Sequence, residues 1–380
     1  MKYYIIAGEA SGDLHGANLI RAIKQQDASA DIRFWGGDRM RHEGGTCVRH
    51  INGLAYMGVW EVATHLPTVL GNLAFCKEDI EAFHPDMVVL IDYPGFNLKI
   101  AKFTHKRGYK NVYYVSPQIW AWKKRRIKNM RLYINALCCI LPFEQDFYAQ
   151  NNFPQACYVG HPLLDEVMRY KAESDAPNTL KEGEQPTSKG WVALMPGSRK
   201  QEIRKMMPYM LRMANYFPKQ QFVITGMGLI GQEYYEEISA QLGGLPSNVS
   251  IAFDQTYRVL SGARSAVVCS GTATLEAALW NVPQVVCYRT SALTALAGRL
   301  LLKVKYISLV NLIEQCAIVP ELVQNGLTDV KLLVTFSELN NDTPFRTAML
   351  EGYDQLRSHL GSGGASQRVA SVIAQTINHS

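Results

Sequence analysis

Short apolar runs alternate with segments of helical periodicity along almost the whole of this 380-residue chain. This alternation is typical of parallel sheets whose two faces are covered by helices. The expected strands form an early and a late series: Lys2–Ala7, Asp31–Trp35, Met87–Ile91, Asn111–Val115, Leu137–Leu141 and Ala156–Val159, then Trp191–Met195, Gln221–Thr225, Val249–Ala252, Ala266–Cys269 and Gln284–Tyr288. Because one hydrophobic core rarely serves a chain of this length, the sequence predicts an α/β protein. It should contain two Rossmann-like, doubly wound parallel-sheet domains facing a cleft, with a helical C-terminus.

A polar segment rich in Glu, Ser, Pro and Gly, residues 171–189, separates the two series of strands. We interpret it as a linker or a surface excursion. The expected N-terminal domain then covers residues 1–170 and the second domain residues 190–343. Residues 344–380 are expected to form helices that could pack back on the N-terminal domain.

Composition restricts the class of protein further. With 47% hydrophobic and 19% charged residues, the chain has the composition of a soluble globular protein. Its eight cysteines include no CxxC pair, so neither a zinc site nor a disulfide framework is expected, and a reducing cytoplasm fits best. No signal peptide is expected, and uncharged runs such as Val62–Cys76 are too short to span a membrane. The net charge of +6 suggests an anionic ligand or surface.

The segment Val267–Ala278 carries the most specific chemistry in the late series. An apolar strand runs into Ser270, Gly271 and Thr272, and a helical segment with Glu276 one turn further on follows. The free N–H groups at the start of such a helix suit a phosphate, and Glu276 could accept hydrogen bonds from a ribose. An ordinary capped helix with a solvated Glu would show the same residues.

Polar residues also follow two other expected strands. Ser198 and Arg199 come after Trp191–Met195, and an Arg guanidinium there suits a diphosphate. Asp92 directly follows Met87–Ile91, where partial burial could raise its pKa toward that of a general base. The alternative for Asp92 is a helix N-cap.

The first expected strand leads into a glycine-rich segment. Gly8 and Gly12 allow a close backbone approach, Glu9 and Asp13 supply acceptors, and an amphipathic helix is expected over Leu14–Gln25. Two acids would repel phosphate, so they suit sugar hydroxyl groups or proton transfer. Asp13 could equally be a helix cap.

Two motifs keep other functions open. Gly226–Gly231 matches GxGxxG, which would fit an NAD-dependent oxidoreductase, although it follows the second strand of its series; we interpret this loop as a wall of the cleft. Trp120–Lys128 combines aromatic and basic residues, which would fit a non-catalytic protein that binds nucleic acid or a membrane surface. A solvated helix face is the simplest alternative.

Two apolar stretches favour contact with lipid. Residues 52–75 are unusually apolar and aromatic, and Leu293–Leu302 is flanked by basic residues. Each could be core, but together with the basic Trp run they favour an acyl-chain or membrane-surface contact.

Taken in order, the motifs resemble those of the lipid-A-disaccharide synthase family across nearly the whole chain. They are Gly8–Asp13, Ile91–Asn97, Ser116–Trp122, Leu141–Glu144, Pro196–Arg199, Ser270–Glu276 and Ser308–Leu312. The resemblance implies a GT-B, inverting glycosyltransferase, peripheral on the cytoplasmic face of the membrane. It would transfer diacylglucosamine from its UDP derivative to the 6-hydroxyl of diacylglucosamine 1-phosphate (lipid X), which gives a β-1,6 disaccharide and UDP. The expected partners are therefore these two substrates and an anionic membrane surface, without nucleic acid.

The resemblance also assigns roles to residues. It makes Asp92 the catalytic base and Glu9 an important first-loop acid, and it places Arg199, Glu276 and Asn311 in the donor site. Many members have an acid where this chain has Gly95, which leaves Asp92 as the candidate base. The remaining expected donor residues are Ser198, Gly226, Ser270, Gly271 and Thr272, and the expected acceptor or first-loop residues are Gly8, Ser11, Gly12, Asp13 and Asn97. Expected lipid contacts are Tyr56, Met57, Trp60, Leu66, Leu70, Trp120, Trp122, Lys123 and Arg125. No metal or other cofactor is expected.

Overall fold

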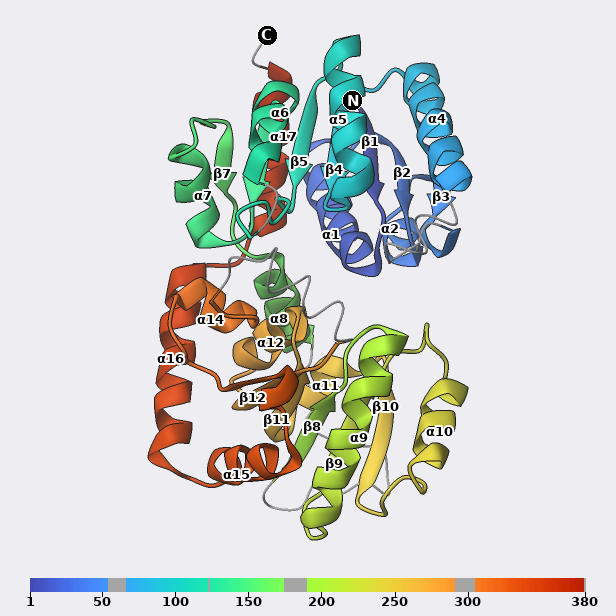
Figure 1. Cartoon of the computed structure of the whole chain (residues 1–380). Coiled ribbons are helices and arrows are strands. Elements are labelled where there is room, and N and C mark those ends of the chain that lie inside the picture. The colour runs from blue at the N-terminus through green and yellow to red at the C-terminus, as the bar shows by residue number, and fades with distance from the viewer. Residues whose placement is uncertain (54–65, 122–123, 174–189, 291–304, 379–380) are drawn as a thin grey trace. The chain divides into compact units, whose positions relative to one another are not determined.

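The computed structural model describes residues 1–53, 66–121, 124–173, 190–290 and 305–378. The chain divides into two compact units (Figure 1). The first contains Met1–Asp165 and Ser362–Ser380, and the second contains Glu166–Gly361. No helix within the described ranges is both long enough and apolar enough to cross a membrane.

The first unit is built on a parallel sheet with strand order β3-β2-β1-β4-β5-β6-β7, seven strands among the described residues. The strands are β1 (Lys2–Ala7), β2 (Asp31–Gly36), β3 (Thr46–His50), β4 (Met87–Ile91), β5 (Asn111–Tyr114), β6 (Ala136–Cys139) and β7 (Ala156–Tyr158). Helices connect and flank them: α1 (Ala10–Gln26), α2 (Asp38–His42), α4 (Leu66–Phe83), α5 (Pro94–Arg107), α6 (Ile127–Tyr133), α7 (Pro142–Ala149) and α17 (Ala365–Asn378).

Both faces of this sheet are buried, which explains why its central strands are apolar throughout. Along β1, Tyr3 and Ile5 belong to one core cluster, together with residues of α1, α2 and α17. Tyr4 and Ile6 belong to a second cluster, together with residues of α4, α5, α6 and α7. The sheet is therefore doubly wound, as predicted.

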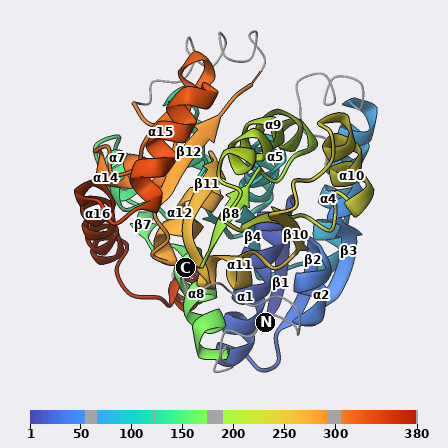
Figure 2. The same cartoon turned by 90° about the horizontal axis from the view of Figure 1, so that it is seen from below.

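The second unit repeats this construction. Its parallel sheet has the order β10-β9-β8-β11-β12-β13, six strands among the described residues. The strands are β8 (Trp191–Met195), β9 (Phe222–Gly226), β10 (Val249–Phe253), β11 (Ala263–Cys269), β12 (Gln284–Tyr288) and β13 (Glu321–Val323). The helices are α9 (Lys200–Tyr216), α10 (Gln232–Gln241), α11 (Thr256–Ser261), α12 (Thr272–Leu279), α14 (Leu309–Glu314), α15 (Asp329–Asn340) and α16 (Pro344–Leu360). Figure 2 shows α9 and α15 on one side of the strands, and α11 and α12 on the other.

The two C-terminal helices belong to different units. Tyr353 of α16 is buried in the second unit, where its hydroxyl lies 3.2 Å from the amide nitrogen of Gln284. Gly361, with a φ of +74°, ends that helix. Beyond it, Val369 and Ile373 of α17 are buried in the core of the first unit, and Nε of Arg368 donates to the carbonyl of Val159 at 2.7 Å.

The boundary between the two units along the chain also differs from the expected one. The division falls between Asp165 and Glu166, inside α8 (Pro162–Glu173), rather than at residue 171. Most of the polar segment 171–189 lies outside the described residues.

Candidate functional site

The first candidate site lies where the strand order of the first sheet reverses, between β1 and β4. These strands pair in parallel with Ala7 opposite Ile91, so the loops that follow them lie at the same edge of the sheet. In open α/β sheets, ligands bind at this switch point, outside the carboxyl ends of the strands. The two loops contribute Gly8 and Glu9 from one strand and Asp92 and Tyr93 from the other.

The backbone at Asp92 is held in an unusual conformation. Asp92 and Tyr93 both have positive φ angles, 44° and 50°, a left-handed region that few side chains adopt without support. That support is visible: the Tyr113 hydroxyl donates to the carbonyl oxygen of Asp92 at 2.6 Å, and the Asn97 amide donates to the same oxygen at 2.8 Å. Strained, over-determined backbone of this kind is common at active sites.

The surroundings of Asp92 also change its acidity. Burial raises the pKa of Asp92 to about 6, and the nearby Glu9 carboxylate adds to the rise. Both causes act by disfavouring the charged form. Asp92 is therefore mostly ionised at neutral pH and gains a proton just below it, which suits a general base.

Glu144, to which the sequence assigned no role, is a second buried acid of the first unit. It is the third residue of α7 and only 1% exposed. The Trp120 indole donates to it at 3.0 Å, and the backbone N–H of Leu141 donates at 3.1 Å. Burial raises the pKa of Glu144 to about 7; these hydrogen bonds oppose that rise, and Asp92 adds to it. The signal in the sequence was a Glu three residues after a strand end that precedes Pro142, half of a capping box.

Three residues expected in the first loop lie instead inside α1, which begins at Ala10 rather than at Leu14. Ser11 is exposed, and Gly12 packs against the Cβ of Ala7. Asp13 is 5% exposed, and its oxygens accept hydrogen bonds from the backbone N–H groups of Gly37, Arg39 and Met40 at 2.6–3.1 Å. Its carboxylate thus binds the N-terminus of α2, and it does not cap the helix that follows it in the sequence, because it lies within that helix.

Gly8 and Asn97 serve the packing of the site. A Cβ on Gly8 would lie 2.4 Å from the ring of Tyr93, so glycine leaves room for that ring. Asn97 is fully buried, and its amide donates to the carbonyl oxygens of Ile91 and Asp92. It therefore positions the backbone at Asp92. Its amide group points into the protein and does not face a bound substrate.

The second candidate site lies at the corresponding switch point of the second sheet, between β8 and β11. These strands pair in parallel with Val268 opposite Met195. The loop after β8 contains Ser198 and Arg199, and the loop after β11 contains Ser270, Gly271 and Thr272. The two motifs that the sequence assigned to a diphosphate thus follow neighbouring strands.

The loop after β11 has the geometry of an anion site. Gly271 has φ 146° and ψ −160°, a region that essentially only glycine occupies, and nothing lies within 4 Å of the position of a Cβ there. Thr272 is exposed and begins α12, so the first N–H groups of that helix point out of an open loop. The Ser270 hydroxyl donates to the carbonyl of Ile307 at 2.9 Å and braces the loop. Glu276 lies one turn further along α12 and is partly buried.

Arg199 lies at the start of α9, the helix that follows β8. It occupies the N-cap position of α9, and its side chain is 59% exposed. Glu202 accepts from the Arg199 guanidinium at 3.4 Å and from the backbone N–H of Ser198 at 3.1 Å. Glu202 therefore steadies both residues, and the exposed guanidinium is available to a solvent-borne anion.

Asn311 lies behind the anion site, fully buried. Its amide nitrogen donates to the carbonyl of Val319 at 2.8 Å and to Glu321 at 2.9 Å, and its oxygen accepts from the N–H groups of Ile318 and Val319. Glu321 in turn accepts from the backbone N–H groups of Ile307 and Ser308. All of the hydrogen-bonding groups of the Asn311 side chain are thus used within the protein. The structure makes Asn311 an organiser of the segment that braces Ser270, rather than a direct contact for a donor.

Gly226 also has a packing explanation. A Cβ there would lie 2.6 Å from the ring of Phe253, and a Cβ on Gly228 would lie 2.2 Å from the Asp254 carboxylate. Both glycines therefore accommodate β10 and the residue that follows it. This loop follows β9, which lies away from the switch point, so neither donor contact by Gly226 nor a dinucleotide site is supported by the geometry.

The expected lipid contacts have mixed positions. Tyr56, Met57, Trp60, Trp122, Lys123 and the stretch Leu293–Leu302 lie outside the described residues. Leu66 begins α4, Leu70 on the same helix is 51% exposed, and Arg125 is exposed. Trp120 is partly buried: its N–H is directed to Glu144, and its ring packs edge-on against Phe143 at 4.9 Å. The indole of Trp120 is therefore tied into the first unit rather than turned outward.

Comparison with known proteins identifies the family. A family model described as lipid-A-disaccharide synthetase matches residues 3–363. The lipid-A-disaccharide synthase of Syntrophus aciditrophicus is 36% identical over 379 residues, covering 98% of this chain and 97% of that protein. The chain belongs to the lipid-A-disaccharide synthase family. It is a glycosyltransferase of lipid A biosynthesis.

Other members and solved structures agree with this assignment. The lipid-A-disaccharide synthase of Nitrosococcus oceani is 35% identical over 362 residues, and the match covers 94% of this chain and 92% of that protein. A UDP-GlcNAc 2-epimerase from Neisseria meningitidis has a TM-score of 0.71 at 13% identity, over 99% of this chain and all of that one. The glycotransferase of kitacinnamycin has a TM-score of 0.68 at 16% identity, over 99% of this chain and 98% of its own. These likenesses confirm the predicted GT-B fold, and membership of the family leaves the oxidoreductase and nucleic-acid alternatives without support.

Proposed function

We propose that this synthase transfers diacylglucosamine from its UDP derivative to the 6-hydroxyl of lipid X, with inversion at the anomeric carbon. One observation carries the proposal: the motif loops of both units follow the strands that flank the two switch points. The first unit offers a carboxylate with a raised pKa, and the second offers an open, cationic helix-terminus site. A base and a nucleotide site are what this transfer requires.

The chemical step is a single displacement. Asp92 takes the proton of the acceptor 6-hydroxyl while that oxygen forms a bond to the anomeric carbon of the donor. The bond between the anomeric carbon and the diphosphate breaks at the same time, and UDP leaves with the electron pair. The anomeric carbon passes through an oxocarbenium-like state, as in inverting glycosidases, where water takes the place of the hydroxyl group. Glu9 helps by holding the pKa of Asp92 up.

The leaving UDP needs its negative charge stabilised. We assign this task to the N-terminus of α12 at Ser270–Thr272 and to Arg199, with Glu276 accepting hydrogen bonds from the ribose. A guanidinium and backbone N–H groups can perform it, so we propose that the reaction needs no metal or other cofactor.

The acyl chains of both substrates imply a membrane surface. We propose that the enzyme acts on the cytoplasmic face of the membrane as a peripheral protein. The exposed apolar residues Leu70 and Phe75 of α4, 51% and 39% exposed, support a lipid contact on this helix, and the exposed Arg125 would suit anionic headgroups.

The test is turnover of the purified protein in detergent with the UDP-diacylglucosamine donor and lipid X. The expected result is equal release of disaccharide and UDP, unchanged by a chelator of divalent metals. UDP, but not NAD, should raise the thermal unfolding temperature. Release of UDP without disaccharide, or turnover only with an added metal, would contradict the proposal.

A further inference from the structure

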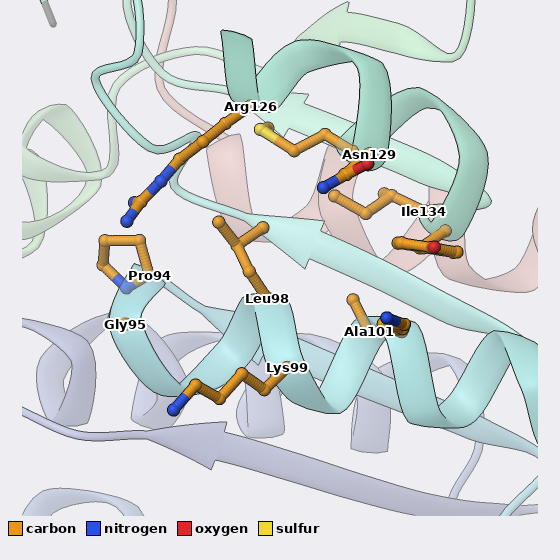
Figure 3. Close-up of a pocket in the computed structure, with 11 residues that line it drawn as sticks. Pro94, Gly95, Leu98, Lys99, Ala101, Arg126, Asn129 and Ile134 are labelled. Atoms are coloured by element: carbon orange, nitrogen blue, oxygen red, sulfur yellow. The ribbon is translucent and has the colours of Figure 1, made fainter. Parts of the chain in front are cut away.

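A cavity of about 260 Å³ opens between α5 and α6 of the first unit. Its inner wall is apolar: Leu98 and Ala101 come from α5, and Met130 and Ile134, 1% and 3% exposed, come from α6 and the residue after it. Figure 3 shows Leu98 pointing into the space between the two helices. The rim of the cavity carries charge of one sign.

Three of the lining residues are cations, Lys99, Lys102 and Arg126, and none is an acid. Within the described part of the chain, neither Lys99 nor Lys102 forms an ion pair, and the Lys102 ammonium lies 5.9 Å from the ring centre of Tyr133. A cavity with an apolar wall and a purely cationic rim suits an amphiphile with a negative headgroup.

The cavity begins beside the proposed base. Pro94, the first residue of α5, lines it and follows Asp92 by two positions. Figure 3 shows Arg126 reaching toward Pro94. The positive charge of Arg126 is also felt by the Tyr113 hydroxyl, which donates to the backbone carbonyl of Asp92. Arg126 thus lies toward the corner that holds the base.

The mouth of the cavity is open at Gly95. This residue is exposed, and nothing lies within 4 Å of the position that a Cβ would take. From Pro94 to Lys102 the helix rises about 12 Å, enough to bring one end of a sugar to the base while its other end lies along α5.

We propose that this cavity binds the acceptor, with Arg126 and Lys99 holding its phosphate while its 6-hydroxyl lies toward Asp92. The apolar wall then faces the root of an acyl chain. This inference rests on the proposed function, because it takes the acceptor to be a phosphorylated glycolipid. It makes the phosphate a determinant of acceptor recognition rather than a bystander.

The test compares two acceptors in detergent without anionic lipid: lipid X and the same glycolipid without its phosphate. Lys99→Glu and Arg126→Gln should each raise KM for lipid X by about tenfold to a hundredfold, since a charge-assisted hydrogen bond contributes about 1.5–3 kcal/mol. KM for the UDP donor, and KM for the acceptor without phosphate, should stay the same. Lys106→Glu is the matched control: it reverses an exposed charge on the same helix outside the cavity and should leave both acceptor constants unchanged.

Equal KM values for lipid X in wild type, Lys99→Glu and Arg126→Gln would overturn the inference, provided that the wild type turns over. So would loss of binding to phosphatidylglycerol vesicles with KM unchanged, because the cations would then serve the membrane. Absence of disaccharide formation by the wild type would instead be a failure of the proposed function. Thermal unfolding of each variant shows whether it is folded, and Lys99 is exposed, so its replacement does not disturb the core.

Discussion

Asp92 combines two unfavourable features in the folded protein. Its backbone has a positive φ. Its carboxylate is partly buried near Glu9, and both effects raise its pKa, to about 6. Residues that carry such costs without a stabilising role are typical of catalytic positions. The free energy of unfolding should therefore increase when the negative charge of Asp92 is removed.

Asp92→Asn tests this. Because the folded pKa is raised, the folded state binds the proton more tightly, and stability is lost as pH rises from about 4 to about 6. At pH 8 the variant should be more stable than wild type by up to about 2–3 kcal/mol, a difference that falls to about 1 kcal/mol at pH 4.5. Asn tolerates the left-handed backbone well. Urea unfolding at both pH values measures it, with the exposed Asp146→Asn as control; a variant less stable than wild type at pH 8 would contradict the account.

Gly271 has a backbone conformation that residues with a side chain rarely adopt. Gly271→Ala should destabilise the protein by about 1–3 kcal/mol, since its φ of 146° excludes a Cβ on conformational grounds alone. The affinity for UDP should fall as well, because the loop has to change shape. Thermal unfolding and calorimetric titration with UDP measure the two effects. Gly326→Ala is the control, because it has equally open space without a positive φ, and an effect as large there would point to packing instead.

At the scale of elements, the sequence was reliable where strands are apolar. All eleven expected strands are present. The central ones, such as β1, β4 and β8, are apolar throughout their buried length because both of their faces are covered. The sequence missed β3 and β13, two edge strands without a buried residue, in which Thr46 and Arg49 are exposed and Glu321 is partly buried. Neither strand contains a long apolar run. Each is recognised as a strand only from its hydrogen bonds to the neighbouring strand, which the sequence does not show.

The same limit applies to the site. The sequence found the loops at both switch points but could not tell a residue that faces a ligand from one that holds the loop. Asp13, Asn97 and Asn311 are polar residues of the motif segments, and all three are buried and hydrogen-bonded to backbone. Whether an amide or carboxylate satisfies the protein or a ligand depends on tertiary contacts that a linear motif does not contain.

Asn311→Ala tests its role as an organiser. Removing the side chain leaves the N–H groups of Ile318 and Val319 without their acceptor, at a cost of about 2–4 kcal/mol in the free energy of unfolding. KM for the donor should rise only slightly, because the substitution affects the Ser270 loop indirectly, through the segment that braces it. Denaturant unfolding measures the cost, with the exposed Asn341→Ala expected to stay within about 0.5 kcal/mol of wild type. Unchanged stability with a large rise in donor KM would show that Asn311 touches the donor after all.

At the scale of the whole molecule, the alternation of strands and helices was enough to predict two doubly wound units. It could not predict which unit each C-terminal helix joins. Both α16 and α17 are amphipathic, and an apolar stripe does not specify the core that buries it. The decision is made by residues such as Tyr353, which bonds Gln284, and Arg368, which bonds Val159.

The division of labour between the units has a measurable consequence. UDP at 100 times its Kd should add about 2.7 kcal/mol to the stability of whatever it binds, so amide hydrogen exchange should slow in the second unit. The strongest protection is expected at the start of α12 and around Arg199, while β1 and β4 exchange as before. Protection confined to the first unit would contradict the assignment of the nucleotide site.

The central claim is that Asp92 is the base of the transfer. The most direct test is the pH dependence of disaccharide formation, kcat/KM for lipid X, in wild type and Asp92→Asn between pH 5 and pH 9. Wild-type activity should rise with pH up to about 6, the raised pKa of Asp92, and level off above it. The variant should lose about 10²–10⁴-fold in rate and show no such rise. Near-normal turnover by folded Asp92→Asn, or the same rise near pH 6 in that variant, would contradict the claim.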